Sequence, residues 1–260
     1  MLAKRIIPTI LCRGRTLVKG VAYDGARSRG LAAQAVRIQA MRGVDEVVLL
    51  DIGATPEGRG PDTGLVRELS EHFFMPLAVG GGITRVEHIQ ALLEAGADKV
   101  VLGTAVFTST LLERAGARYG CQALVASVDV RARKVWSHCG RQEWPMAPEH
   151  HAMLCEDWGA GEILLNAMDR EGTMEGYDLE LISKVARRVN IPVIASCGAG
   201  TYEHMHEALQ AGADAVAAGA MFLNTDATPA GAAEYLHQRG IEVRLQTREP
   251  ISAILDQRRT

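Results

Sequence analysis

The sequence predicts a single-domain α/β fold, a (β/α)8 barrel of the TIM type built from two similar halves. Three observations support this prediction: an internal repeat, a regular alternation of short apolar strands with helices, and a length of 260 residues. Barrels of this kind occupy about 250 residues as one unit. We assign residues 1–245 to the barrel. Residues 246–260 form a carboxyl-terminal tail, either a short appended helix or a frayed terminus.

The internal repeat consists of two stretches that share one plan at an offset of 116 residues. PLAVGGGITRVEHIQALLEAGADKVVLGT (76–104) returns as PVIASCGAGTYEHMHEALQAGADAVAAGA (192–220), so that Gly82 corresponds to Gly198. Each copy reads as strand, glycine-rich turn, helix, strand and second glycine-rich turn. This order is typical of parallel βαβ units. The repeat therefore predicts two half-barrels.

The first half begins with the strand 5–11 (RIIPTIL), in which Pro8 fits an early or irregular position. Residues 12–30 are longer than an ordinary βα loop, so they form either a mobile lid over a site or a plain surface excursion. The next strand, 46–52 (EVVLLDI), is the apolar run expected of a parallel strand covered on both faces. The other elements predicted in this half are helix 31–41, helix 64–72, strand 76–79, helix 85–95, strand 99–102 and helix 111–119.

The second half begins with the apolar strand 123–130 (ALVASVDV). A hairpin or loop of mixed polarity, 131–146, separates this strand from helix 148–158. The strand 162–168 (EILLNAM) then leads into a polar turn and helix 178–189. The remaining elements are strand 192–196, helix 202–211, strand 215–218 and helix 230–239. The count of strand–helix units reaches eight, which closes a barrel.

Composition excludes several classes of protein. The net charge of -3 provides no basic surface for nucleic acid, and no apolar run is long enough to span a membrane. The amino terminus leads straight into a strand, so we expect no signal peptide. The five cysteines lack metal-ligand spacing and fit a reduced cytoplasm, and we expect no metal and no cofactor. Four histidines are predicted on helices away from the functional rim and in contact with solvent: His150, His151, His204 and His206.

Functional groups in such barrels lie on the loops that follow the carboxyl ends of the strands. Asp51, Asp129 and Asp169 occupy such positions and are candidates for acid–base chemistry, because a water-poor cup moves the pKa of a carboxyl group toward neutrality. The alternative for each is an exposed, purely structural carboxylate. Other side chains predicted at this rim are Leu11, Lys19, Asn166 and Glu171.

Glycine-rich turns at helix N-termini bind phosphate through backbone N–H groups. Because the repeat contains matched turns, it predicts two phosphate sites at the carboxyl-terminal rim. The alternative is that these glycines only let helices pack close to strands. The predicted phosphate-binding residues are Gly81, Gly82, Gly103, Thr104, Gly172, Gly198, Gly200, Ala218 and Gly219.

Several stretches resemble one family over nearly the whole chain: VDEVVLLDI (44–52), VGGGI (79–83), MDREGT (168–173) and IPVIASCGAG (191–200). The family is the HisF type, the cyclase subunit of imidazole glycerol phosphate synthase. The resemblance implies a substrate with a phosphate at each end. It also implies a partner glutaminase of the HisH type, which docks on the amino-terminal face and sends ammonia through the barrel axis.

The resemblance also assigns roles to particular residues. Asp129, Asp51 and Lys19 match catalytic positions, and Asn166, Asp169 and Glu171 lie where the substrate is expected. An ammonia gate at the amino-terminal entrance is implied for four charged residues at strand starts. Buried charges need partners, and a ring of alternating sign pairs its own charges. The gate residues are Arg5, Glu46, Lys99 and Glu162.

The sequence departs from the family where the first strand ends. The family has an acid there that acts together with a second acid, whereas this chain has Leu11 and keeps only Asp129. Leucine cannot transfer a proton, so this pattern predicts slow cyclisation, and Leu11→Asp is expected to raise the rate by about a hundredfold. Further departures are Gly103, Glu171 and Cys197.

A side branch of the family, associated with amidation of sugars, has similar features. Like this chain, its members have an apolar residue after the first-strand proline, and they resemble it at 74–77, 127–130 and 215–219. Three functions therefore remain open. The first is a synthase subunit that uses ammonia from a glutaminase, with impaired or altered activity. The second is a non-catalytic ammonia conduit of a sugar-amidating complex. The third is an aminoaldose isomerase of the related HisA type, although that reaction also needs two acids.

Overall fold

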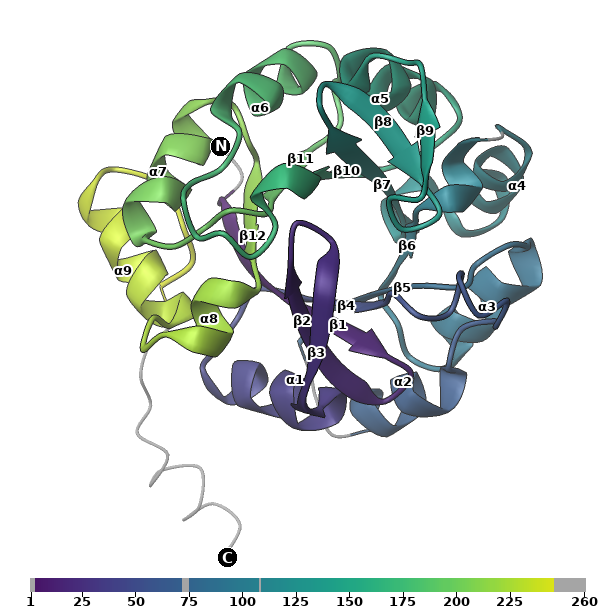
Figure 1. Ribbon diagram of the computed structural model, residues 1–260, viewed down its shortest axis with the longest axis horizontal. Coiled ribbons are helices and arrows are strands. Elements are labelled where there is room, and N and C mark those ends of the chain that lie inside the picture. Colours follow the sequence, from purple (N-terminus) through teal and green to yellow (C-terminus); the bar gives the residue numbers. More distant parts are fainter. Residues whose placement is uncertain (1–2, 72–74, 108, 246–260) are drawn as a thin grey trace, which may run out of the picture.

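The computed structural model describes residues 3–71, 75–107 and 109–245, and its centre is a closed barrel of eight parallel strands (Figure 1). Each strand hydrogen-bonds to the next, and the last pairs with the first. The predicted fold class is confirmed. The barrel strands are β1 (Arg5–Arg13), β4 (Val47–Asp51), β5 (Leu77–Gly80), β6 (Lys99–Leu102), β7 (Leu124–Arg131), β10 (Glu162–Ala167), β11 (Val193–Ser196) and β12 (Ala215–Ala218).

Helices surround the ring of strands, as Figure 1 shows. Their buried residues face the outer side of the sheet and form the larger apolar core, with Val36, Ile89 and Leu112 fully buried. None of the helices in the described part of the chain has the length and apolar character needed to cross a bilayer. The helices are α1 (Ala32–Met41), α2 (Thr63–Ser70), α3 (Val86–Glu94), α4 (Ser109–Tyr119), α5 (Pro148–Asp157), α6 (Leu179–Ala186), α7 (Tyr202–Gln210), α8 (Ala220–Asn224) and α9 (Pro229–Gln238).

The two halves repeat their local hydrogen bonds as well as their sequence. Asp62 caps α2 by accepting from the N–H of Leu65, and Asp178 caps α6 in the same way. The aspartates of the two AGAD stretches also match: Asp98 accepts from the N–H of Leu77 at 2.9 Å, and Asp214 accepts from the corresponding strand at 3.1 Å. These carboxylates satisfy backbone donors at helix and strand starts, which is why both copies retain them.

The inside of the barrel is layered along its axis. A smaller apolar cluster, which includes Ile7, Val48 and Leu164, fills the middle. Because parallel partners in register point to the same side of a sheet, the pairing of Thr9 with Val48 directs the Thr9 side chain inward. Leu11 lies two residues further along the same face of β1. The axis therefore runs from charged residues at the amino end, through an apolar layer, to polar residues at the carboxyl end.

Residues 12–31 contain the largest difference from the sequence prediction. They form a regular β-hairpin of β2 (Thr16–Val21) and β3 (Asp24–Leu31), and β2 pairs with β1. Figure 1 shows the hairpin extending over the middle of the ring of strands. Its turn residues, Ala22 and Tyr23, have φ values of 49° and 66°. Such a turn normally contains Asn or Gly, so the usual hairpin signal is missing from the sequence.

Other elements agree with the prediction or add to it. The polar segment after β7 is a hairpin of β8 (Lys134–Ser137) and β9 (Gln142–Trp144), one of the two predicted alternatives. Four short segments were not predicted: α8, η1 (Thr104–Phe107), η2 (Cys121–Ala123) and η3 (Met168–Arg170). The predicted tail, residues 246–260, lies outside the described residues, as does the predicted end of helix 64–72 at His72.

Candidate functional site

Asp129 lies near the carboxyl end of β7, in the wall of the cup formed by the strand ends. Its carboxylate accepts hydrogen bonds from Asn166 Nδ2 at 2.8 Å and Ser127 Oγ at 3.1 Å. Burial raises the pKa of Asp129, while hydrogen bonds from Asn166, Ser127 and Tyr23 oppose that rise. A carboxyl group with a raised pKa is suited to exchange protons near neutral pH. Ser127 and Tyr23 were not among the residues predicted from the sequence.

Asn166 connects Asp129 to the next strand of the barrel. It lies directly opposite Asp129 in the pairing of β7 with β10, and it is 4% exposed. Its amide also donates to Ser127 Oγ at 2.9 Å. Asn166 and Asp129 therefore share one hydrogen-bond network, which agrees with the predicted position of both residues at the rim.

Asp51 is held by groups from three segments instead of standing free. One carboxylate oxygen accepts from the N–H groups of Gly53 at 2.9 Å and Gly14 at 3.2 Å, and the other accepts from Arg59 at 3.2 Å. The backbone of Asp51 also touches Gly81, where a Cβ atom would lie 2.4 Å from the Asp51 carbonyl oxygen. These contacts give Asp51 a structural part in joining the loops around β4.

Lys19 and Glu171 form a buried ion pair between the hairpin and the loop after β10. Their side chains are 7% and 11% exposed. Lys19 Nζ also lies beside Gly219, 3.2 Å from where a Cβ atom would stand. The hairpin thus carries a cation to the turn after β12, one of the predicted phosphate turns.

The glycines of the predicted phosphate turns fall into two groups. Gly82, Gly198 and Gly200 pack tightly, because a Cβ atom on any of them would come within 2.3 Å of a backbone oxygen. In contrast, a Cβ on Gly103 would meet nothing within 4 Å. The first group fits the alternative that these glycines only let helices pack close to strands. The turn at Gly103 has room for an anion, and the turn at Gly219 lies beside Lys19. Phosphate binding stays a prediction.

Gly172 and Asp169 lie apart from the centre of the cup. A Cβ on Gly172 would lie 2.4 Å from the carbonyl oxygen of Gly20, so this glycine permits the close approach of the hairpin. The Asp169 side chain is 59% exposed and pairs with Arg131 at 3.6 Å. The structure therefore does not bring Asp169 together with Asp129, since its polar turn points outward.

Two histidines in equivalent places of the repeat lie next to the glycine turns. Nδ1 of His204 accepts from the N–H of Gly200 at 3.2 Å, and Nδ1 of His88 lies 3.1 Å from the carbonyl oxygen of Gly82 and 3.4 Å from the nitrogen of Thr84. The prediction that His204 is simply solvated is therefore wrong. Sequence reasoning missed His88, although its offset of 116 residues from His204 marked the pair.

The prediction that His151 is solvated is also wrong. Its side chain is 1% exposed and stacks on Phe107 with ring centroids 4.6 Å apart, while His150 beside it is exposed. Burial, together with the charge of His150, lowers the pKa of His151 to about 4. Trp144 of β9 also stacks on Phe107, with ring centroids 4.7 Å apart, so the β8–β9 hairpin contributes a third ring to this cluster.

This buried histidine predicts a pH dependence of stability. The pKa of His151 is lower in the folded chain than the ordinary 6.5, so its contribution is complete above pH 6.5 and is lost as the pH falls toward 4. We expect about 2 to 3 kcal/mol of the unfolding free energy to disappear between pH 7.5 and 4.5 through this group. Urea unfolding of His151→Leu should show a smaller drop than the natural chain. An unchanged drop, equal to that of His150→Gln, would contradict the expectation.

The four predicted gate residues meet at the amino-terminal end of the barrel, which confirms their predicted convergence. Glu46 bonds Arg5 at 2.6 Å and Lys99 at 3.0 Å, and Glu162 bonds the same two cations at 3.0 and 3.1 Å. Burial lowers the pKa of Arg5, but the two carboxylates outweigh this effect and raise it. We call these four side chains the charged ring. Their role as a gate stays a prediction.

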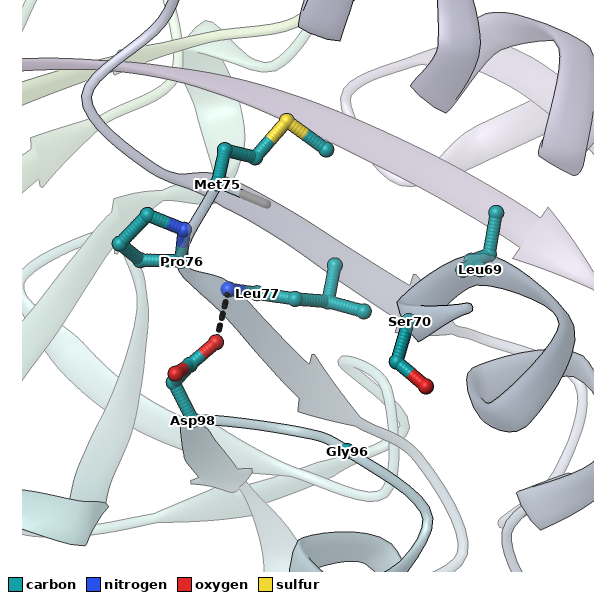
Figure 2. Close-up of a pocket in the computed structure, with 7 residues that line it drawn as sticks. All are labelled: Leu69, Ser70, Met75, Pro76, Leu77, Gly96 and Asp98. Atoms are coloured by element: carbon teal, nitrogen blue, oxygen red, sulfur yellow. Dashed lines mark hydrogen bonds between the residues drawn. The ribbon is translucent and has the colours of Figure 1, made fainter. Parts of the chain in front are cut away.

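A cavity of about 220 Å³ lies on the outer side of the same end. Figure 2 shows Pro76 and Leu77 at the start of β5, with Asp98 bonded to the Leu77 N–H. Because Asp98 precedes Lys99, this hollow lies next to the charged ring and far along the axis from Asp129. The other lining residues are Leu69, Ser70, Met75 and Gly96.

The fold and the cup define the class: a (β/α)8 barrel of two similar halves with a partly buried carboxylate at its carboxyl-terminal mouth. A family described as histidine biosynthesis protein matches residues 5–228. The chain is also 41% identical over 251 residues to the imidazole glycerol phosphate synthase subunit HisF of Chlorobium limicola, an alignment that covers 94% of this chain and 100% of that protein. The chain therefore belongs to the histidine biosynthesis protein family and is a HisF-like member of it.

Proposed function

We propose that the chain is the synthase subunit of an ammonia-using complex, a cyclase of the imidazole glycerol phosphate synthase type that acts on a substrate with a phosphate at each end. The observation that carries the proposal is the difference in chemistry between the two ends of the barrel. A buried charged ring lies at one end, and the Asp129 network lies at the other. This arrangement fits an enzyme that takes ammonia in at the first end and uses it at the second.

The axis between the two ends contains acceptors for a small polar molecule. Glu46 Oε1 at the ring and Thr9 Oγ1 above the apolar layer are both buried, and neither has a hydrogen-bond partner among the described residues. A buried acceptor without a partner is costly, and a passing ammonia molecule would satisfy it. These atoms support ammonia transfer through the barrel, with Ser127 and Asp129 next along the axis.

The partner that fits this proposal is a glutaminase of the HisH type. It would dock on the amino-terminal face, over the charged ring and beside the hollow at Asp98. The HisF of Chlorobium limicola is by its name one subunit of a synthase, which supports a second subunit here as well.

Two assays test this proposal, because one depends on ammonia transfer from the glutaminase and the other only on the use of free ammonia. Lys99→Met should lower glutamine-dependent turnover in the presence of the glutaminase several-fold, because it breaks the ring at the entrance. Turnover with ammonium salt at alkaline pH should stay within about twofold, since free ammonia enters the cup from solvent. Lys4→Met is the matched control, because Lys4 pairs with Asp214 outside the charged ring. Equal losses in both assays would contradict a gate.

A second function is favoured by one specific observation, the leucine at position 11. The chain would then be a non-catalytic ammonia conduit of a sugar-amidating complex, as the side branch of the family is. The ammonium-dependent assay with the bis-phosphorylated substrate separates the two. Product formation by the barrel alone supports the cyclase, whereas its complete absence, with the charged ring intact, supports the conduit.

A further inference from the structure

A histidine near the start of a helix binds a glycine turn in each half of the barrel. His204 is the third residue of α7, and its Nδ1 accepts from the N–H of Gly200, four residues earlier, at 3.2 Å. His88 has the same place in α3, where its Nδ1 lies 3.4 Å from the nitrogen of Thr84, again four residues earlier. Both members of each pair are related by the repeat offset of 116 residues. The barrel therefore contains this contact in duplicate.

Each histidine ring also packs on a glycine of the preceding loop. A Cβ atom on Gly60, in the loop after β4, would lie 3.4 Å from Cε1 and Nε2 of His88. A Cβ atom on Gly176, in the loop after β10, would lie 3.7 Å from Cδ2 of His204. These two glycines are again related by the offset of 116 residues. Both rings are half-buried, and each joins a loop to the helix that follows the next strand.

The same loop glycines contact the glycine turns. A Cβ atom on Gly82 would lie 3.0 Å from the carbonyl carbon of Gly60, and a Cβ atom on Gly198 would lie 2.8 Å from that of Gly176. In the second half, the Gly176 N–H also donates to the carbonyl oxygen of Gly198 at 2.8 Å. Histidine, loop glycine and turn thus form one packed unit in each half. We call this unit the histidine clamp: His88, Gly60 and residues 82–84 in the first half, and His204, Gly176 and residues 198–200 in the second.

The two clamps differ in the histidine tautomer that they require. Nδ1 of His204 accepts a hydrogen bond, so the ring proton of this histidine lies on Nε2. Nδ1 of His88 lies 3.1 Å from the carbonyl oxygen of Gly82 as well as 3.4 Å from the nitrogen of Thr84. His88 therefore binds its turn in either tautomer, by donating to Gly82 or by accepting from Thr84. The second clamp needs an acceptor at the position of Nδ1.

Each clamp leaves the neighbouring N–H groups of its turn available. The N–H groups of Gly82 and Ile83 donate no hydrogen bond within the described part of the chain, and those of Gly198 and Ala199 donate none there either. N–H groups at the start of a helix bind anions. The clamp holds the peptide that follows these groups, and it therefore fixes the direction in which they point.

The proposed function gives the substrate a phosphate at each end, and the inference rests on that function. We propose that His88 and His204 are positioning residues, one for each phosphate. Neither side chain has to touch the substrate. Each clamp orders the free N–H groups of its turn before the anion arrives, and binding does not have to order them. Donors that are already in place bind more tightly for this reason.

The test is binding of the bis-phosphorylated substrate without ammonia, followed by phosphorus-31 NMR of its two phosphates. His204→Ala removes the acceptor and should raise Kd about three- to tenfold, the usual effect of one hydrogen bond. Only one of the two phosphorus signals should change its bound position, and His88→Ala should change the other. His206→Ala is the matched control, because His206 lies on the same helix and pairs with Glu203 at 3.6 Å. Equal changes in both signals would show a general loosening of the rim and would overturn the proposal.

Two further variants separate positioning from packing. His204→Asn has an amide oxygen near the position of Nδ1 and should keep Kd within about twofold, whereas His204→Gln reaches the position of Nε2 and should resemble His204→Ala. Equal Kd values for His204→Asn and His204→Ala would contradict the role of the acceptor.

Inorganic phosphate is the second probe, because its binding needs neither the substrate nor the reaction. We expect it to bind His204→Ala more weakly than the natural chain and His204→Asn. If the natural chain bound inorganic phosphate but not the bis-phosphorylated substrate, the proposed function would be rejected. The clamp is refuted separately if inorganic phosphate binds the natural chain and His204→Ala equally, or binds neither.

Discussion

Asp129→Asn is expected to lower ammonium-dependent turnover by about 100- to 10,000-fold, the range that general acid–base groups contribute. Asparagine keeps the size of the side chain and its capacity to accept hydrogen bonds from Ser127 and Asn166, but it cannot take up a proton. Because burial already raises the pKa of Asp129 by disfavouring its charge, a neutral amide should not destabilise the fold. The measurement is kcat with saturating ammonium salt, together with the urea unfolding midpoint.

The matched control for this variant is Asp157→Asn on the exposed end of α5. It makes the same chemical change outside the barrel and should leave kcat within about twofold. The natural enzyme should also lose activity as the pH falls through the raised pKa of Asp129, above the usual range for aspartate. If Asp129→Asn retained more than a tenth of the natural rate, the central role of this carboxylate would be refuted.

Glu46→Ala is expected to reduce the unfolding free energy by about 3 to 5 kcal/mol, the usual effect of removing one partner of a buried ion pair. Its side chain is 3% exposed and pairs with both Arg5 and Lys99. After the substitution, two partly buried cations share the single carboxylate of Glu162. Urea unfolding at neutral pH measures the loss directly.

Glu180→Ala provides the comparison for this second variant. Glu180 also pairs with two cations, Arg133 and Lys184, but its side chain is 59% exposed. Solvent screens such pairs, so we expect a much smaller loss of unfolding free energy than for Glu46→Ala. Similar losses for the two variants would show that the charged ring is as well solvated as the outer surface, which would also weaken its proposed role in ammonia entry.

The barrel itself was predictable because its signals are local and repeated. Eight apolar runs of strand length alternate with helices, and the repeat at an offset of 116 residues shows that the two halves share one order of elements. The resemblance to the HisF family implied the convergence of Arg5, Glu46, Lys99 and Glu162, and the barrel provides its physical reason. Each lies at or beside the start of a barrel strand, and closing a parallel barrel brings all strand starts to one end.

The cup was predictable only in part. Strand-end positions placed Asp129 and Asn166 correctly, because register determines which residues of neighbouring strands lie opposite each other. The same rule did not distinguish Asp51 and Asp169 from Asp129. Backbone N–H groups and Arg59 hold the first, and the second turns outward, which depends on loop contacts that no spacing encodes.

The sequence by itself determined the fold, the two-fold repeat and the ends of the barrel at which charges and polar groups gather, since strand order and direction follow from periodicity along the chain. Only the tertiary structure decided that residues 16–31 form a hairpin that brings Lys19 to Glu171, and that His151 is buried beside Phe107. The Lys19–Glu171 and Phe107–His151 contacts join residues more than 40 positions apart in the chain. Their formation depends on how whole elements pack, and no local pattern in the sequence records it.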